Sequence, residues 1–557
     1  MSTGTENVAA PGQAGRTAAE RSSVGEPQAG RRWSVRGNPW LVVGVAVVVF
    51  SYLLLRWART SPGFDPYGWL VWGYQTLHGT LNLGGAPSWK PVTFFFTVPY
   101  SLFGHFSWWL WTVTAVSVAL AGPLFAGRIV HRLILRSTGE RWPAIIGAVF
   151  AGLCLLGIVQ YTHYWLSSQS DPMLVTFFLA AIDMSMTGRH RWAITFLWLS
   201  SLGRPETWPF FGLYFLWAWR AVPRMRLLMV VELALIPCFW FGVPVLAGSP
   251  WNVASNLAQD SPRMLHSNKI AGTITRFREL TYSPVEVMAG IGLIIAILRR
   301  DWRVLVVAGC AALWMVVEIA FALHGFPGVP RYMFEAAAAM IVVAGVGVGW
   351  LLSEPARLMA TRGGSLRISA LRSAWRDGAA SKSEAGAGST AGSAGGPAPS
   401  SPGRPRWATP ARVIGGLVVL AVVALMVPRA IHAARTEHAD LNHERARTAE
   451  IHRLDAALKA FGGYRFIRSC GDPASDVEWV SILAWYTKLD VGFVGHRPAF
   501  IVRFEKKPSI LFTALGNGWI VHTYHLASGA PTACQRLNSA YYIVTRQHPG
   551  GYVGHQT

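Results

Sequence analysis

The sequence predicts a mainly α-helical membrane protein, a polytopic bundle of about eleven transmembrane segments followed by a C-terminal extracytoplasmic α/β domain. Hydrophobic residues make up 52% of the 557 residues and charged residues only 14%, and the mean hydropathy is +0.32. This composition is too apolar for an ordinary soluble domain. Long apolar runs separated by short polar turns, and a polar segment with strand-like stretches after the last run, complete the prediction.

The chain opens with a polar segment rich in Pro, Gly and Ser, residues 1–39, which we expect to be a disordered cytoplasmic tail. Apolar runs long enough to suggest membrane helices then follow at 41–58, 107–127, 142–160, 172–187, 191–219, 226–246, 284–298, 303–323, 332–352 and 411–428.

The run 191–219 is basic at both ends, which predicts that both ends lie in the cytoplasm. It is too short for two full crossings, since each needs about twenty residues. We therefore expect a broken, shallow hairpin whose apex is the segment from Gly203 to Glu206. Broken helices at membrane depth are tolerated where they line a cavity.

The formal net charge of +22 reflects membrane topology rather than nucleic-acid binding. With alternating sides and a cytoplasmic N-terminus, the inner segments hold 26 of the 50 Lys and Arg residues and the outer loops hold eight. Cytoplasmic loops concentrate these residues. The pattern predicts a multi-pass protein of the plasma membrane with an extracytoplasmic C-terminus and no nucleic-acid partner.

The chain divides into parts by composition. Residues 40–352 form the predicted transmembrane catalytic domain, 353–410 a disordered basic cytoplasmic linker, 411–428 the last transmembrane helix and 429–557 the extracytoplasmic domain. In the last part, YRFIR, AFIVRF, WIVHTYHL and AYYIVTR favour strands and EWVSILAWYTKL favours a helix.

Two cysteines, Cys470 and Cys534, lie in the C-terminal domain. Exported domains commonly pair their cysteines, so we expect a disulfide between them, the alternative being two free thiols.

The segment from Thr60 to Tyr100 lies between the first two apolar runs and carries Asp65 and Lys90 in aromatic surroundings. We expect a large non-cytoplasmic loop that covers an active site, with residues 69–77 forming a helix in the membrane interface. Two plainer roles remain open. Asp65 begins an Asp-Pro pair that suits a turn, and Lys90 could extend its amine to the membrane surface.

Further polar side chains reach the same outer face from later in the chain. They are His163, Asp171, Arg204, Glu206, Arg331 and Tyr332. Arg204 and Glu206 lie at the predicted helix break, and charged groups at membrane depth usually mark function. A purely structural pair between these two residues is the alternative. The basic loop 247–283 suits either an anionic ligand or anionic lipid head groups.

Five of these features together resemble the GT-C superfamily of polyprenyl-phosphate-sugar glycosyltransferases. They are Asp65 after the first helix, the pair Lys90-Pro91, Asp171 after the third helix, LGRPE at 202–206 and PRY at 330–332. The similarity covers about residues 40 to 350 and extends to protein O-mannosyltransferases and to aminoarabinose transferases of lipid A. The chain differs from the latter at Trp89, where they carry an acid, and from the former at Pro66.

The resemblance implies transfer of a sugar from a polyprenyl phosphate to an extracytoplasmic acceptor (a cell-envelope glycan, lipid or protein), with inversion at the anomeric carbon. Asp65 would be the general base, and Asp171 would orient the acceptor or hold a divalent ion, Mg²⁺ or Mn²⁺; no cofactor is otherwise expected. Lys90, Arg331 and, more weakly, Arg204 would bind the phosphate.

Glu206, His163 and Tyr332 would support the site, and membrane lipids would surround the helices. The alternative is a polytopic carrier or lipid flippase, which would also use broken helices and buried charge without glycosyl transfer chemistry.

Overall fold

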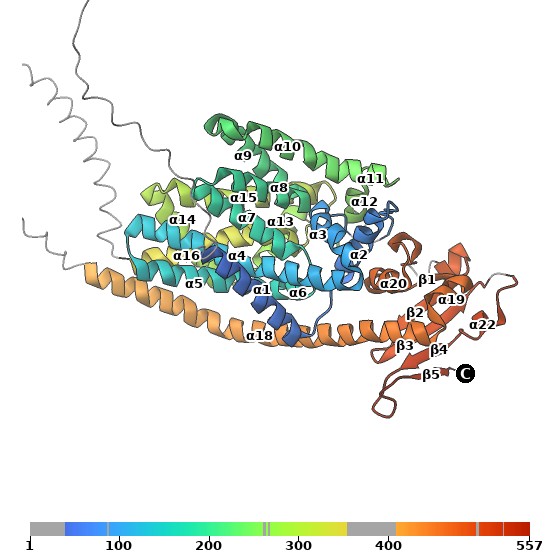
Figure 1. Ribbon diagram of the computed structural model, residues 1–557. Helices are drawn as coiled ribbons and strands as arrows, with labels where there is room; N and C mark the ends of the chain where they lie inside the picture. The colour runs from blue at the N-terminus through green and yellow to red at the C-terminus, as the bar shows by residue number, and fades with distance from the viewer. Residues whose placement is uncertain are drawn as a thin grey trace, which may run out of the picture. The chain divides into compact units, whose positions relative to one another are not determined.

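The computed structural model describes residues 39–85, 88–259, 263–265, 268–353, 408–496, 501–526 and 528–556 (Figure 1). Contacts between Cα atoms divide the chain into two units, Met1–Ala46 and Val47–Thr557. Every side-chain contact discussed below lies within the second unit. Residues 1–38 of the predicted tail and residues 354–407 of the predicted linker lie outside the described residues.

Each of the ten predicted apolar runs is helical in the structure. A run of apolar residues of this length satisfies its backbone polar groups within a helix. Six helical stretches of the described chain are long and apolar enough to cross a membrane: Trp40–Ala58, Pro91–Thr138, Pro223–Leu246, Trp302–Leu323, Pro330–Leu352 and Arg412–Ala460. A seventh results if α13 (Lys269–Arg278) and α14 (Ser283–Arg299), bent by 99°, form one span.

Four predicted spans belong neither to these six stretches nor to the bent pair and form helices of 14 or 16 residues, so the count of eleven crossings stays a prediction. They are α5 (Arg141–Leu156), α7 (Asp171–Met186), α8 (His190–Gly203) and α9 (Trp208–Ala221). The long helices of the bundle are α1 (Pro39–Ala58), α4 (Ser107–Thr138), α15 (Trp302–Leu323), α16 (Phe334–Leu352) and α18 (Ala408–Ala460). The remaining helices are α2 (Phe64–Leu77), α3 (Phe94–Tyr100), α6 (Tyr161–Leu166), α10 (Arg226–Pro237), α11 (Val243–Leu246), α12 (Val253–Gln259), α19 (Gly463–Cys470), α20 (Val480–Thr487) and α22 (Thr532–Gln535).

Helix α16 lies inside the bundle, packed against α4, α5, α14 and α15. Small residues allow this close packing. A Cβ on Gly147 of α5 would come within 2.6 Å of the carbonyl oxygen of Gly345 in α16. Helices in membranes often associate through such small residues, because these let backbones approach.

Helix α18 is a single helix of 53 residues that joins the predicted last span to the polar helix expected after it. It packs along α14 and α16 and then contacts α6, α20 and β3 (Figure 1). The C-terminal segment is therefore carried on a continuous extension of a candidate membrane helix.

The C-terminal segment forms a mixed five-stranded sheet in the order β1-β2-β3-β4-β5. Strands β1 and β2 are parallel, with Asp472 opposite Ser509, and the other pairs are antiparallel, with Ser509 opposite Tyr524 and Val521 opposite Ala540. Their bounds are β1 (Asp472–Ala474), β2 (Ser509–Ala514), β3 (Gly518–Tyr524), β4 (Ala540–Ile543) and β5 (Tyr552–His555). The indole of Trp519 in β3 is fully buried and donates to the carbonyl oxygen of Glu450 at 3.0 Å, which ties the sheet to α18.

Two strand predictions in this segment are wrong, and the others hold. YRFIR belongs to α19, because glycines with positive φ at 462 and 463 end the preceding helix and let a new one begin. The described part of AFIVRF is a helical turn, Ile501–Glu505, followed by Lys506 at a φ of 50°, which interrupts an extended chain. WIVHTYHL and AYYIVTR supply β3 and β4, and α20 lies in EWVSILAWYTKL. Cys470 and Cys534 form a disulfide.

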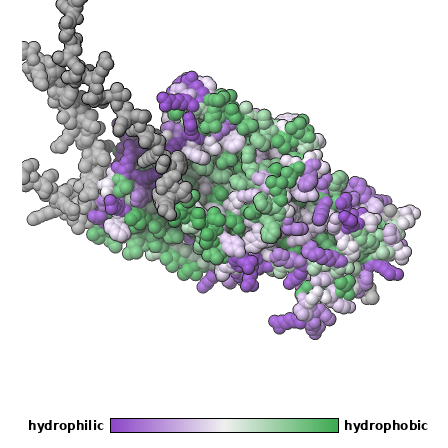
Figure 2. Space-filling view, in the orientation of Figure 1, coloured by the Kyte–Doolittle hydropathy of each residue, from purple (hydrophilic) through white to green (hydrophobic). Residues whose placement is uncertain are grey.

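Figure 2 shows hydrophobic side chains over much of the visible helical region, whereas the C-terminal strands carry many hydrophilic ones. Exposed Leu, Val and Ile side chains are frequent on α1, α10, α14 and the first half of α18. Such a surface suits contact with lipid rather than water.

Candidate active site

A cavity of about 870 Å³ collects most of the predicted site residues. It is lined by the start of α2, residues 88–90, α6, the break between α8 and α9, the turn at 330–332 and the outer part of α18. Its charged or titratable lining side chains are Asp65, Lys90, His163, Arg204, Glu206, Arg263, Arg331, Asp440, His443, Glu444, Arg447 and Glu478.

Asp65 stands in the first turn of α2, where a carboxylate is favoured by the helix dipole. Its Oδ1 accepts the backbone N–H of Ser88 at 3.0 Å, and the side chain is buried apart from its face on the cavity. Among the described residues, Oδ2 accepts no hydrogen bond. Asp65 is thus a fixed carboxylate with one oxygen available.

Lys90 is buried beside Asp171 at the start of α7. Its Nζ donates to Ser170 Oγ at 3.1 Å and to Asp171 Oδ1 and Oδ2 at 3.2 and 3.3 Å. Burial lowers the pKa of Lys90, and the charge of Asp171 offsets only part of that effect. An anion entering the cavity would favour the charged amine further.

Arg204 lies at the predicted break, between α8 and the 3₁₀ turn Pro205–Thr207. Gly203 lets the end of α8 pack closely against α7, because a Cβ at position 203 would lie only 2.2 Å from the Leu174 side chain. The guanidinium donates to Asp171, and to the carbonyl oxygen of Arg331 at 3.0 Å. Asp171 is fully buried, pairs with both Lys90 and Arg204, and does not line the cavity.

Arg204 also lies close to residues of the adjoining 3₁₀ turn, of the turn at 330–333 and of α16. Its Nε lies 3.6 Å from Glu335 Oε1, its Nη1 lies 3.9 Å from Glu206 Oε1, and its guanidinium lies 4.5 Å from the ring centre of Tyr332. Sequence reasoning left Glu335 out of the site residues, although an acid inside an apolar helix was a signal for it.

Arg331 has a different environment. Its guanidinium lies 5.6 Å from the ring centres of Tyr164 and Tyr332, and no ion pair or side-chain hydrogen bond of Arg331 occurs among the described residues. Its Nε is buried without a hydrogen-bond partner. A guanidinium that lines a cavity and has a donor without an acceptor is suited to bind an incoming anion.

The outer part of α18 forms the facing wall, which sequence reasoning assigned to a separate domain. His163 Nδ1 in α6 lies 2.9 Å from Asp440 Oδ2. Arg447 donates to the carbonyl oxygens of Ser61 and Pro62 at 3.0 and 3.1 Å, and Ser61 N donates to Thr448 Oγ1 at 2.8 Å. Helix α18 therefore fixes the chain that leads into Asp65.

Helix α2 confirms the predicted helix but not its predicted place in the membrane interface. Trp69, Leu70 and Trp72 are fully buried. The helix packs against α3 and α20, and the ring centres of Tyr67 and Trp485 lie 6.3 Å apart. The aromatic side chains are thus used for contact with protein rather than lipid.

The residues around Asp171 do not fit a divalent metal. No group of three or more His, Cys, Asp or Glu side chains in the described part of the chain is arranged to hold one. Both oxygens of Asp171 already accept from Lys90. Within the basic loop 247–283, Asp260 and His266 lie outside the described residues.

No family model matches the chain, and no curated protein matches it. Two crystal structures match: ArnT from Cupriavidus metallidurans bound to undecaprenyl phosphate, and the same protein in the apo state. Each covers 91% of this chain with a TM-score of 0.45, at 14% and 15% identity, and the chain covers 97% and 96% of them. The functional proposal below rests on the side chains of the cavity.

Proposed function

We propose that the protein is a membrane glycosyltransferase that moves a sugar from a polyprenyl-phosphate donor to an extracytoplasmic acceptor with inversion. One observation carries the proposal: the cavity presents a carboxylate with an available oxygen, Asp65, together with buried cations, of which Arg331 has no anionic partner among the described residues. A base and an anion site are what this transfer requires.

Each part of the transfer has a candidate group. The acceptor hydroxyl oxygen bonds to the anomeric carbon while the bond from that carbon to the phosphate oxygen breaks. Asp65 Oδ2 takes the hydroxyl proton, and the bonding electron pair leaves with the polyprenyl phosphate. Arg331 and Lys90 offset the phosphate charge, which preorganised cations do well where water is scarce. Asp171 and Arg204 hold Lys90 and the 331 backbone in place.

The cavity also offers apolar surface for a prenyl chain. Aromatic side chains from the region between α9 and α15 line it alongside the charged groups: Trp208, Trp240, Phe241, Trp251 and Phe321. A lipid phosphate needs both kinds of surface.

The test is complementation of a deletion strain with Asp65→Asn. The amide Oδ1 can still accept the Ser88 N–H, but a neutral amide cannot take the proton. We expect the extractable donor sugar to accumulate, the envelope acceptor to lose that sugar, and the purified variant to bind polyprenyl phosphate while transferring 10² to 10⁴-fold more slowly, about what a general base contributes.

Asp476→Asn is the matched control, because Asp476 is an exposed acid outside the cavity. It should restore the wild-type sugar pools. Transfer by Asp65→Asn at the wild-type rate would rule out Asp65 as the base. Unchanged sugar pools in the deletion strain would overturn the glycosyltransferase function itself and favour a carrier.

A further inference from the structure

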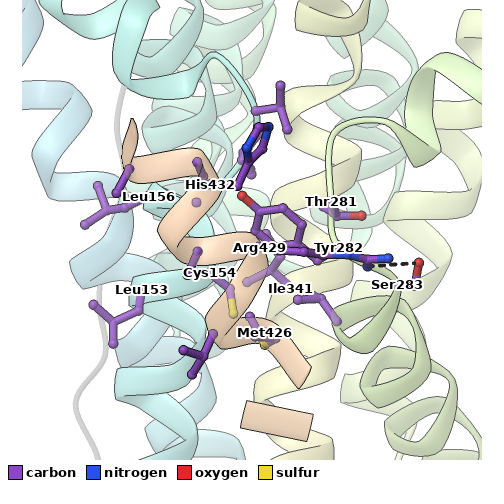
Figure 3. Close-up of a pocket in the computed structure, with 18 of the residues that line it drawn as sticks. Leu153, Cys154, Leu156, Thr281, Tyr282, Ser283, Ile341, Met426, Arg429 and His432 are labelled. Atoms are coloured by element: carbon purple, nitrogen blue, oxygen red, sulfur yellow. Dashed lines mark hydrogen bonds between the residues drawn. The ribbon is translucent and has the colours of Figure 1, made fainter. Parts of the chain in front are cut away.

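A second cleft, of about 920 Å³, lies against an earlier stretch of α18, residues 423–437, between that helix, the end of α5 and the connection from α13 to α14. It shares no lining residue with the cavity of Asp65. Figure 3 shows Leu153, Ile341 and Met426 in the lower part of the cleft and Tyr282, His432 and Arg429 above them.

The lining of the cleft changes character along α18. Val423, Met426 and Val427 face it first, Arg429 and His432 follow, and Glu437 comes last. Positions 423, 426, 427, 430, 433, 434 and 437 form one stripe of a helix. Arg429 and His432 line the cleft beside this stripe, so along the helix axis the lining passes from apolar through basic to acidic.

Two of the charged side chains that line the cleft, Arg429 and Glu437 of α18, are poorly paired among the described residues. The hydrogen bond from Arg429 Nη1 to Ser283 Oγ is long, 3.4 Å, and no ion pair of Arg429 occurs among the described residues. One carboxylate oxygen of Glu437, Oε2, is buried without a hydrogen-bond partner. Buried polar atoms are normally satisfied, so the Glu437 oxygen has capacity for a ligand, and the exposed Arg429 guanidinium is accessible to one.

We propose that this cleft binds an aminophospholipid, whose acyl chains pack against Leu153, Ile341 and Met426, whose phosphate meets Arg429 and whose ammonium meets Glu437. The order of apolar, basic and acidic side chains along α18 indicates which class of phospholipid fits the cleft. An aminophospholipid carries its phosphate next to the tails and its ammonium beyond the phosphate.

Arg429 and Glu437 are eight residues apart, about 12 Å along the helix axis. A phosphate and an ammonium, each contacted by a long side chain, can fill this interval. A lipid that ends in a phosphate or a glycerol leaves Glu437 without a cation. The inference does not depend on the transfer reaction.

The test is lipid binding by the purified full chain after delipidation, measured by native mass spectrometry. Phosphatidylethanolamine and phosphatidylglycerol with identical acyl chains are supplied together. We expect the wild type to prefer phosphatidylethanolamine and Glu437→Gln to reduce that preference about tenfold, the size of one charged hydrogen bond. Arg429→Met should weaken binding of both lipids, whereas Arg435→Met, an exposed residue outside the cleft, should change neither.

A second pair of variants tests the apolar part. Met426→Trp fills the cleft, and Leu425→Trp adds the same bulk on a side chain that is 66% exposed and does not line it. Loss of the preference only in Met426→Trp supports the site. Equal binding of the two lipids by the wild type, a preference that survives Glu437→Gln, or tighter binding of polyprenyl phosphate in competition for this cleft would overturn the proposal.

Discussion

At the scale of the residue, Asp171 is a single buried carboxylate that compensates two buried cations, Lys90 and Arg204. Asp171→Asn should destabilise the protein by about 3 to 5 kcal/mol, because it leaves buried charge without a partner. The measurement is thermal unfolding in detergent, together with transfer per folded molecule, which should also fall because the two cations lose their anchor.

Asp183 provides the matched control for this prediction. It is equally buried, in α7, and pairs with Arg128 and Arg132, far along the helix from the cavity. Asp183→Asn should lower the unfolding temperature as well but leave the folded fraction active. If both variants lose transfer equally, Asp171 has a role in overall stability only.

Arg331 allows a cleaner test of phosphate binding than Lys90, because no carboxylate in the described chain pairs with it. Arg331→Met should weaken binding of polyprenyl phosphate about tenfold to a hundredfold, the effect of a hydrogen bond to a charged group of about 1.5 to 3 kcal/mol. The unfolding temperature should change little. Titration of purified protein with polyprenyl phosphate measures the affinity, and an unchanged dissociation constant would remove Arg331 from the anion site.

At the scale of the element, the contact between α6 and α18 depends on pH. Burial alone would lower the pKa of His163, but the hydrogen bond and charge of Asp440 outweigh burial and raise it above its ordinary value. A raised pKa in the folded protein contributes stability below the unfolded value of about 6.5. That contribution is lost as the pH rises through the folded value.

Asp440→Asn should therefore lower the unfolding temperature at pH 5.5, and the difference from the wild type should shrink by pH 8.5. The comparison is made at constant salt, since the pair is partly exposed. A difference that is constant or grows with pH would show that the charged pair does not hold these two helices together.

The elements differ in how far the sequence predicts them. The apolar runs could become only helices, and Gly203-Arg204-Pro205 within a short run could only break one. The convergence of Lys90, Asp171, Arg204 and Arg331 also follows from the sequence, because alternating topology places their four segments on one face.

Other features depend on contacts that no local pattern contains. Asp440 and Arg447 reach the cavity only because α18 continues straight beyond its apolar part and packs against residues nearly four hundred positions earlier. YRFIR is rich in aromatic and β-branched residues, as strands are. In a helix over 463–470, however, Ile467 and Cys470 lie on one side, and the structure buries both. Trp69 and Trp72 suit a membrane interface as well as a protein core, and in the structure they are buried, with their rings packed against those of Trp111 and Trp89.

At the scale of the whole molecule, the predicted topology places the cavity, the disulfide and the sheet on the extracytoplasmic side and the pair of Asp183 with Arg132 on the cytoplasmic side. The disulfide closes a loop with a sequence separation of 64 residues. Such a link stabilises a folded domain by about 4 kcal/mol in the chain-entropy account, provided that its compartment is oxidising. Sidedness is therefore part of the functional proposal.

The last prediction tests that sidedness. Single cysteines are introduced at two exposed positions, His438→Cys on the outer part of α18 and Arg224→Cys in the turn before α10, after Cys154, Cys238 and Cys310 are replaced by Ala. The excess of basic residues in the inner segments predicts that Arg224 is cytoplasmic and His438 is outside. A membrane-impermeant maleimide should label His438→Cys in intact cells and Arg224→Cys only after permeabilisation, while Cys470 and Cys534 react only after reduction. Labelling of Arg224→Cys in intact cells would place the cavity on the cytoplasmic side, where neither an extracytoplasmic acceptor nor the disulfide could be accommodated.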